Sequence, residues 1–308
     1  MKNLSFFDTL RYHFKASFLS LFGLRFAILL AATSLILMSS SVAVGNKNTS
    51  NRNDVCGTYM DLNTFQVGES LTYRINYKWS AINMTAGNAT FNLNEVNYKG
   101  KPTYHVKCVG QTASAFNWFY KVDDSYESYI DKKSMRPVKF ALDINEGKYS
   151  EQTQYEFFHD NNRANVNYRI KKGEVKTKNE DVAISSCVQD IVSILYYTRS
   201  LDFSKFKVGE TVHIDLFTSE KTKEVFFRYL GKEVVKTKLG KMRCIKLSPY
   251  LLNSDTFGEG GEDKMIIYAS DDANKLPVLI ESPVTIGKVK VHLTDYEGLK
   301  YPITAMVD

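Results

Sequence analysis

The chain has 308 residues, of which 44% are hydrophobic and 13% aromatic, so it can bury one large core or the cores of two fused halves. Its 40 basic and 34 acidic residues give a formal net charge of +6. No element combines a basic cluster with interleaved aromatic side chains, so we expect no nucleic-acid partner.

The N-terminal region is typical of an export signal. Four basic residues precede an uncharged run from Phe26 to Val44, and Ser41 and Ala43 supply the small side chains that signal peptidase requires. Residues 1–43 are therefore predicted to be a cleaved signal peptide. The alternative is an uncleaved inner-membrane anchor formed by residues 26–44, the one case in which we expect membrane association. Residues 44–63 are rich in Asn, Ser and Thr and are predicted to be a flexible lead-in.

A segment near the start of the exported part returns later in the chain. Residues 65–71 read FQVGESL and residues 206–212 read FKVGETV, 141 positions apart. Several turn-forming residues follow at a spacing of 140, with Gly100, Asp131, Pro137 and Gly147 recurring as Gly240, Asp271, Pro277 and Gly287. This register predicts a first β repeat over residues 64–186 and a second over residues 203–308, which together form one structural unit.

Both halves alternate apolar and polar residues. From Leu71, the side chains of Tyr73, Ile75, Tyr77 and Trp79 share one face of a half-buried strand. The same pattern continues over residues 89–93, 104–108, 138–144, 155–157, 166–170, 212–216, 225–229, 245–247, 265–267, 278–280 and 289–293. We predict a mainly β protein in which two tandem β-meander repeats build a large curved antiparallel sheet or a partly open barrel.

Between the halves, over residues 187–202, the apolar residues recur at steps of three and four positions, and this spacing predicts the one central helix. Asp190 and Arg199 lie in this segment, nine positions apart, so they share no local contact on a helix. We expect both to act as a structural clamp that joins the helix to partners on the sheet.

The four cysteines allow three disulfide pairings in an oxidising compartment. Cys56 lies in the polar lead-in and Cys187 before the helix, so these two are the predicted pair, whereas Cys108 follows an apolar strand face and is predicted to be a buried thiol. No C-x-x-C spacing is present, and we expect neither a metal site nor a cofactor.

Several segments together resemble an exported bacterial family catalogued as domain of unknown function 3108. They are Phe65-x-Val-Gly-Glu, Asp124 to Pro137, Gln189 to Arg199, Val208-Gly209-Glu210 and Asp271 to Val278, and the resemblance covers about residues 65–293. It implies a β-rich envelope protein of the Gram-negative periplasm and implies no reaction. The chain is also distantly similar, at the level of fold, to periplasmic lipoprotein carriers, whose incomplete barrel surrounds an acyl-binding cavity.

The sequence contains no G-x-S-x-G, no H-E-x-x-H and no phosphate-binding glycine loop, and the five histidines are scattered, so we predict that the protein is not an enzyme. The candidate ligand- or partner-binding residues are aromatic: Phe116, Trp118, Phe119 and Tyr120 in one short segment, and Tyr73, Tyr77 and Trp79 on one strand. Ordinary packing explains the same residues. The predicted function is binding of a hydrophobic or lipidic ligand or of an envelope protein; a scaffold or chaperone-like factor in envelope assembly is the second reading, and an enzyme with an unrecognised site the third.

Overall fold

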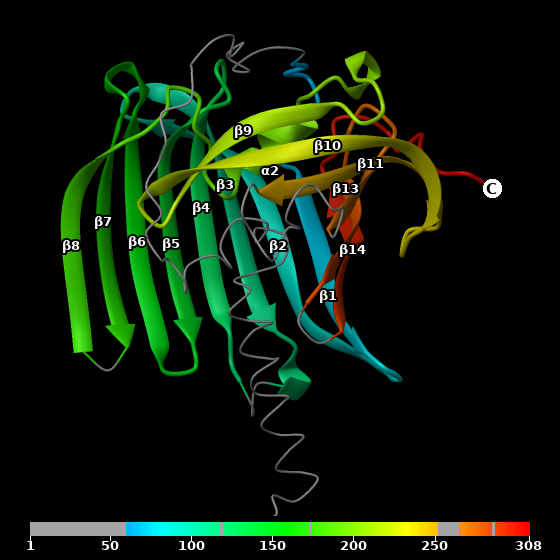
Figure 1. The fold of residues 1–308 in the computed structure, drawn as a ribbon, viewed down its shortest axis with the longest axis horizontal. Helices are drawn as coiled ribbons and strands as arrows, with labels where there is room; N and C mark the ends of the chain where they lie inside the picture. The colour runs from blue at the N-terminus through cyan, green and yellow to red at the C-terminus, as the bar shows by residue number, and fades with distance from the viewer. Residues whose placement is uncertain (1–59, 117–119, 173, 252–264, 285–286) are drawn as a thin grey trace, which may run out of the picture.

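The computed structural model of the protein describes residues 60–116, 120–172, 174–251, 265–284 and 287–308. Within them, fourteen strands form one antiparallel sheet in the order β8-β7-β6-β5-β4-β3-β2-β1-β14-β13-β12-β11-β10-β9 (Figure 1). The strands are β1 (Ser70–Trp79), β2 (Ile82–Tyr98), β3 (Lys101–Thr112), β4 (Asp123–Asp131), β5 (Pro137–Glu146), β6 (Tyr149–Phe158), β7 (Arg163–Lys172), β8 (Glu174–Ala183), β9 (Thr211–Thr218), β10 (Lys221–Lys236), β11 (Lys241–Leu251), β12 (Ile266–Ser270), β13 (Pro277–Pro283) and β14 (Lys288–Glu297). The predicted mainly β, antiparallel fold is confirmed.

The sheet consists of two meanders joined side by side. Strands β1 to β8 pair consecutively, β9 to β14 do the same, and β1 pairs with β14, for example at Ile75 opposite Val291. The edge strands β8 and β9 do not pair with each other, so the described sheet is curved but not closed into a barrel. Figure 1 shows β9, β10 and β11 crossing in front of the first-half strands, with the helix α2 (Ser193–Arg199) between them.

The turns that mark the sequence repeat have the same backbone conformation in both halves. Gly68 (φ 94°) and Gly209 (φ 90°) precede β1 and β9, and Met135 (φ 55°) and Lys275 (φ 47°) lie in the turns before β5 and β13. Non-glycine residues rarely adopt positive φ, so its occurrence at Met135 and again 140 positions later at Lys275 supports the proposed duplication. In this register β6 corresponds to β14, and β7 and β8 have no counterpart in the second half.

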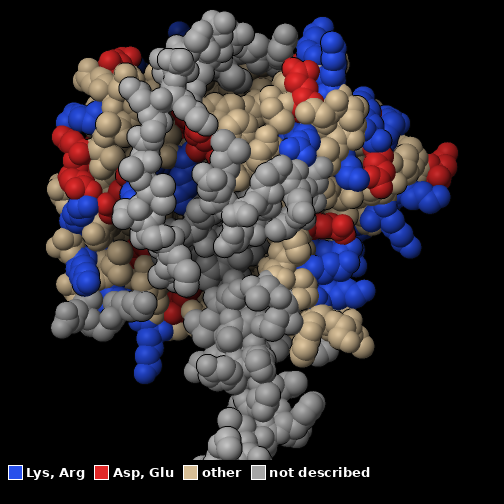
Figure 2. All heavy atoms as spheres, in the orientation of Figure 1, with Lys and Arg blue, Asp and Glu red and all other residues tan. Residues whose placement is uncertain are grey.

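The inward faces of the strands form the core, as their alternation predicts. On β1, Leu71, Tyr73 and Tyr77 are buried, Arg74 is exposed, and Trp79 is half-buried against the core. Figure 2 shows basic and acidic side chains intermixed over the described part of the face in view, in agreement with the modest net charge.

The helix is shorter than the predicted range of 187–202. The segment before it pairs with the edge strand β9 in the manner of a strand. Gln189 donates its N–H to Asp215 O at 2.7 Å, and its carbonyl oxygen accepts the N–H of Phe217 at 2.7 Å. After the helix, Leu201 forms a β-bridge with Met60. Strand-type pairing at both flanks therefore limits α2 to seven residues.

The predicted signal peptide, and residues 44–59 of the predicted lead-in, lie outside the described residues. At the end of the lead-in, Asp61 donates its N–H to Ser200 O at 2.6 Å, so this end is attached to the chain that follows α2. None of the helices in the described ranges has the length and hydropathy of a membrane span.

Candidate functional site

Asp190, just before α2, is hydrogen-bonded both to the sheet and to the start of the helix. Its Oδ2 accepts a hydrogen bond from Ser128 Oγ on β4 at 2.6 Å, and its Oδ1 accepts the N–H groups of Val192 and Ser193 at 2.8 and 2.7 Å. Ser193 Oγ accepts the N–H of Asp190 at 2.8 Å, which completes a reciprocal helix cap. Asp190 is fully buried, and this burial raises the pKa of its carboxyl to about 6.

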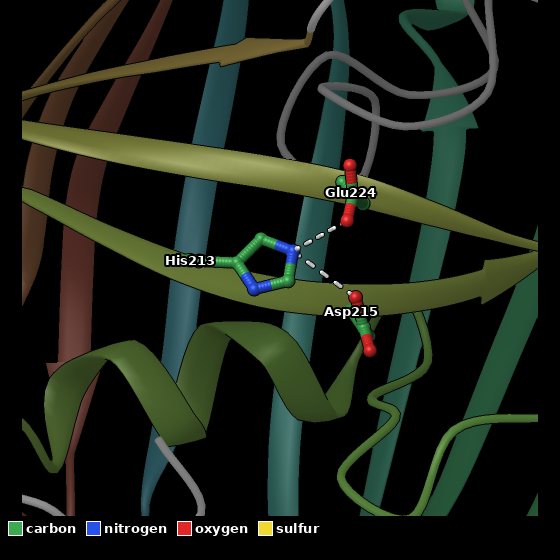
Figure 3. A group of neighbouring side chains, drawn as sticks. All are labelled: His213, Asp215 and Glu224. Carbon is green, nitrogen blue, oxygen red and sulfur yellow. Dashed lines mark ion pairs between the residues drawn. The ribbon is translucent and has the colours of Figure 1, made fainter. Parts of the chain in front are cut away.

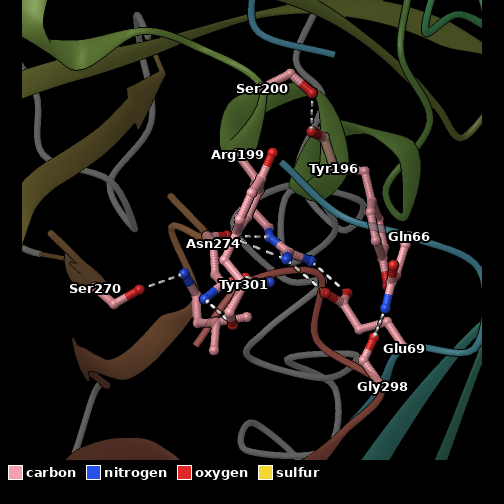
Figure 4. A network of polar contacts seen from close by, with 10 residues as sticks. Gln66, Glu69, Tyr196, Arg199, Ser200, Ser270, Asn274, Gly298 and Tyr301 are labelled. Carbon is pink, nitrogen blue, oxygen red and sulfur yellow. Dashed lines mark hydrogen bonds and ion pairs between the residues drawn. The ribbon is translucent and has the colours of Figure 1, made fainter. Parts of the chain in front are cut away.

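The last turn of α2 carries Arg199, whose guanidinium is fully engaged in polar contacts (Figure 4). Its two terminal nitrogens donate to the carboxylate oxygens of Glu69 at 2.6 and 2.7 Å, and the guanidinium also donates to Asn274 O at 3.2 Å. Glu69 precedes β1 and Asn274 precedes β13, so a single side chain contacts both halves. Burial disfavours the charged guanidinium, but the adjacent Glu69 carboxylate raises the pKa of Arg199 overall.

Aromatic rings surround this ion pair. The guanidinium carbon of Arg199 lies 5.4 Å from the ring centroid of Phe65 and 5.2 Å from that of Tyr196, within the range of cation–π attraction. The hydroxyls of Tyr73 and Tyr196 are buried without hydrogen-bond partners among the described residues, and burial raises the pKa of both phenols. This side of α2 is therefore part of the buried hydrophobic core.

The other side of α2 faces a cavity of about 60 Å³, named here the α2 pocket. It lies between α2 and the inward faces of the second-half strands, and its lining is almost entirely apolar. The lining residues are Ile194, Leu195, Thr198, Arg199, Phe203, Leu216, Val225, Phe227, Leu247, Ile267, Ala269, Lys275 and Pro277. Ile194, Leu195 and Ile267 remain only half-buried, so apolar surface is available inside the fold.

One half-buried cation also lines the pocket. Lys275 Nζ donates to Thr64 Oγ1 at 3.5 Å, and burial lowers the pKa of this amine despite the nearby carboxylates of Asp61 and Asp202. Arg199 is engaged by Glu69, so Lys275 is the lining cation that lacks a direct carboxylate contact among the described residues.

None of the described aromatic residues singled out in the sequence lines the α2 pocket. Tyr73, Tyr77 and Trp79 lie on β1 in or against the hydrophobic core. Tyr120 is half-buried and donates its hydroxyl to Glu146 Oε2 at 3.4 Å, and burial raises its pKa. Trp118, Phe119 and the side chain of Phe116 lie outside the described residues. A ligand or partner role for these seven residues stays a prediction.

Asp190 contacts Ser128 on β4, and Arg199 contacts Glu69 just before β1. A joint role of the two residues as a clamp stays a prediction. The sequence did not identify Glu69 as a partner, because it lies in a motif that both halves share. The pocket residues were also missed. One signal was available in the sequence. The helix α2 is apolar on two faces, with Ile194 and Leu195 opposite Tyr196, whereas a helix with one solvent-facing side needs only one apolar face.

The described cysteines are of two kinds, and the buried thiol predicted at Cys108 is present. Cys187 is disulfide-bonded, and Cys108 and Cys244 carry free, buried thiols. Cys56 lies outside the described residues, so its pairing with Cys187 stays a prediction. Burial raises the pKa of both free thiols, that of Cys244 to about 12, so neither is a reactive thiolate at neutral pH.

One group of side chains among the described residues could hold a metal ion: His213 and Asp215 on β9 and Glu224 on β10 (Figure 3). Sequence spacing gave no sign of it, because the third member is placed by the register of the hairpin. It lies on the outward face of the sheet, away from the α2 pocket.

Comparison with known proteins identifies a family and two similar structures. The family described as "Protein of unknown function (DUF3108)" matches residues 72–294. A β-barrel-like protein of domain of unknown function DUF1849 from Brucella abortus aligns at 9% identity and a TM-score of 0.49, over 75% of this chain and 97% of that chain. The lipoprotein LppX from Mycobacterium tuberculosis aligns at 9% identity and a TM-score of 0.21, over 77% and 88%. At these TM-scores neither similarity bears on function. No curated protein matches the chain.

Proposed function

The chain belongs to the DUF3108 family, whose description assigns no activity, and from the α2 pocket we propose that it is a non-enzymatic protein that binds a hydrophobic or lipidic ligand. The observation that carries this proposal is the half-buried apolar surface of Ile194, Leu195 and Ile267 around an internal cavity. Covering such surface stabilises a complex by about 25 cal/mol per Å².

The size of the cavity limits what it holds without rearrangement. About 60 Å³ corresponds to roughly two molecules of liquid water, whereas pockets for whole small molecules span roughly 300–1,000 Å³. The α2 pocket therefore accepts the end of a slender apolar chain, and a longer chain requires α2 to move away from the second-half strands. The polar anchors at Asp190 and Arg199 lie at the two ends of α2, which leaves Ile194 and Leu195 as the part adjacent to a ligand.

The pocket chemistry favours binding over catalysis. Of its lining residues only Arg199 and Lys275 are ionisable, and both are basic, so the lining supplies no acid–base pair. Action outside the cytoplasm, in the periplasm, is supported by the signal-like N-terminus and by the disulfide at Cys187, since disulfides persist in oxidising compartments. An envelope protein partner and a role in envelope assembly remain the alternatives offered by the aromatic segment at residues 116–120.

A matched pair of substitutions on β12 tests the proposal. Ile267→Trp places an indole in the α2 pocket, whereas Ile266→Trp changes an equally half-buried neighbour that points to the other face. With an environment-sensitive fluorescent acyl probe, we expect Ile267→Trp to weaken binding by about tenfold or more, equivalent to 1.4 kcal/mol, and Ile266→Trp to change it less than about twofold. Equal affinities for both variants, or no probe binding by the wild-type protein, contradict the proposal.

A further inference from the structure

The side chains of His213, Asp215 and Glu224 are brought together by the β9–β10 hairpin. His213 and Asp215 are two positions apart on β9, so they share a face, and Glu224 on β10 lies directly opposite Asp215. The alternating neighbours Val212, Ile214 and Leu216 are buried, so this trio projects from the outward face of the sheet (Figure 3). Strand pairing, and not a flexible loop, therefore sets the positions of the three groups.

The distances between their polar atoms match a shared coordination sphere. One ligand atom from each residue lies within 4.8 Å of the other two. His213 Nε2 is 3.1 Å from Asp215 Oδ1 and 3.7 Å from Glu224 Oε1. Two ligands at about 2.1 Å from a tetrahedral metal are separated by about 3.4 Å, a value that lies between these two distances.

The imidazole nitrogen is directed between the carboxylates and not along a hydrogen bond to either. Nε2 is shielded from solvent, and although it approaches Asp215 within ion-pair distance, the contact does not have hydrogen-bond geometry. The imidazole ring packs on Phe226, with the ring centroids 5.0 Å apart, which restricts its rotation. The nitrogen is thus held where a cation between the three residues would contact it.

Electrostatics favours a cation at this point. Like charges directly opposite each other on paired strands are destabilising, and Asp215 and Glu224 form such a pair. The side chains of His213 and Glu224 are 26% and 40% exposed, so water can complete a coordination sphere. One imidazole with two carboxylates suits zinc and similar divalent transition ions better than magnesium or calcium, which prefer oxygen ligands only.

We propose that His213, Asp215 and Glu224 form a binding site for a divalent transition-metal ion, with Zn²⁺ as the representative ion. The site joins the edge strand β9 to β10, and bound metal adds a cross-link between them. It is separate from the α2 pocket and does not depend on the proposed ligand-binding function.

The test is calorimetric titration of the tag-free, disulfide-intact mature protein with Zn²⁺ at pH 7.5 after removal of metal with a chelator. One equivalent is expected to bind, Mg²⁺ in excess is expected not to compete, and His213→Ala and Glu224→Gln are each expected to weaken binding by about tenfold or more. His105→Ala is the matched control, because His105 also contacts an outward carboxylate, that of Glu127 at 3.0 Å, but Lys107 already pairs with it at 2.9 Å. This variant is expected to bind Zn²⁺ like the wild type.

Two results would overturn the proposal. One is the absence of saturable Zn²⁺ binding by the wild-type protein below about 1 mM, which would mean that the three side chains form only a histidine–carboxylate ion pair. The other is Zn²⁺ binding that His213→Ala and Glu224→Gln leave unchanged, which would place the metal elsewhere. Because Glu224 is substantially exposed, Glu224→Gln is expected to fold normally, and its unfolding temperature without metal checks this.

Discussion

Replacing Glu69 by Gln tests the clamp at the end of α2. The side chains of Glu69 and Arg199 are 0% and 2% exposed, and two hydrogen bonds of 2.6 and 2.7 Å join them. The amide of Gln keeps the shape but leaves the guanidinium as a buried charge without a counter-ion. Breaking a buried pair in this way costs about 3–5 kcal/mol, which is a large fraction of the roughly 5–15 kcal/mol that stabilises a typical domain.

The chain supplies a matched control through its repeat. Glu210 occupies the position that corresponds to Glu69, but it is exposed, and the hydrogen bond that its carboxylate accepts from within the described residues is a local one, from the N–H of Lys207 at 2.9 Å. Urea unfolding of the mature protein, followed by circular dichroism, is expected to show that Glu210→Gln costs less than about 1 kcal/mol. Added salt should alter the effect of Glu69→Gln little, because buried pairs are weakly screened. Equal losses for the two variants, or a loss below 1 kcal/mol for Glu69→Gln, would refute the reasoning.

Two further predictions concern the flanks of α2. The carboxyl of Asp190 has a pKa of about 6 in the folded protein and about 3.9 in an unfolded chain. Between these two pH values the folded state binds more protons than the unfolded state. The contribution of this carboxyl to stability therefore falls as pH rises from 4 to 7. Relative to Asp190→Asn, the wild type should lose about 3 kcal/mol of unfolding free energy over that range. A stability difference between the two proteins that does not vary with pH would contradict the raised pKa of Asp190. Non-reducing peptide mapping should recover a peptide of Cys187 joined to one of Cys56. This bond would close a loop of 187 − 56 = 131 residues and stabilise the fold by about 4–5 kcal/mol through the lost chain entropy of the unfolded state. A Cys187 peptide joined to any other cysteine would exclude this pairing.

Local patterns predicted the sheet well. The alternation from Leu71 to Trp79 corresponds to β1 almost residue for residue, because one side of that strand faces the core and the other faces solvent. The glycines of the repeat likewise marked turns, since Gly68 and Gly209 both adopt a backbone conformation that other residues avoid.

The sites depend on contacts that local patterns do not contain. Glu69 and Arg199 are 130 positions apart, and only the curvature of the whole sheet brings them together. Glu69 and Glu210 look alike in sequence, yet one is buried and the other exposed, because α2 covers only one of the two corresponding positions. To predict the group of His213, Asp215 and Glu224, one would need the strand register that places Glu224 opposite Asp215. The helix was overextended because Gln189 is satisfied by the edge of β9, a partner that helical periodicity cannot reveal.

The two ends of the open sheet differ in how they resist adding another strand. On β9, Gln189 from the preceding linker already occupies backbone groups of Asp215 and Phe217. On β8, charged side chains such as Lys176, Lys178 and Asp181 occupy the outer strand, and charge on an edge strand discourages association between molecules. A foreign chain that joined this sheet at β9 would have to displace the linker that leads into α2, so occupancy of that edge and the position of the helix are mechanically linked.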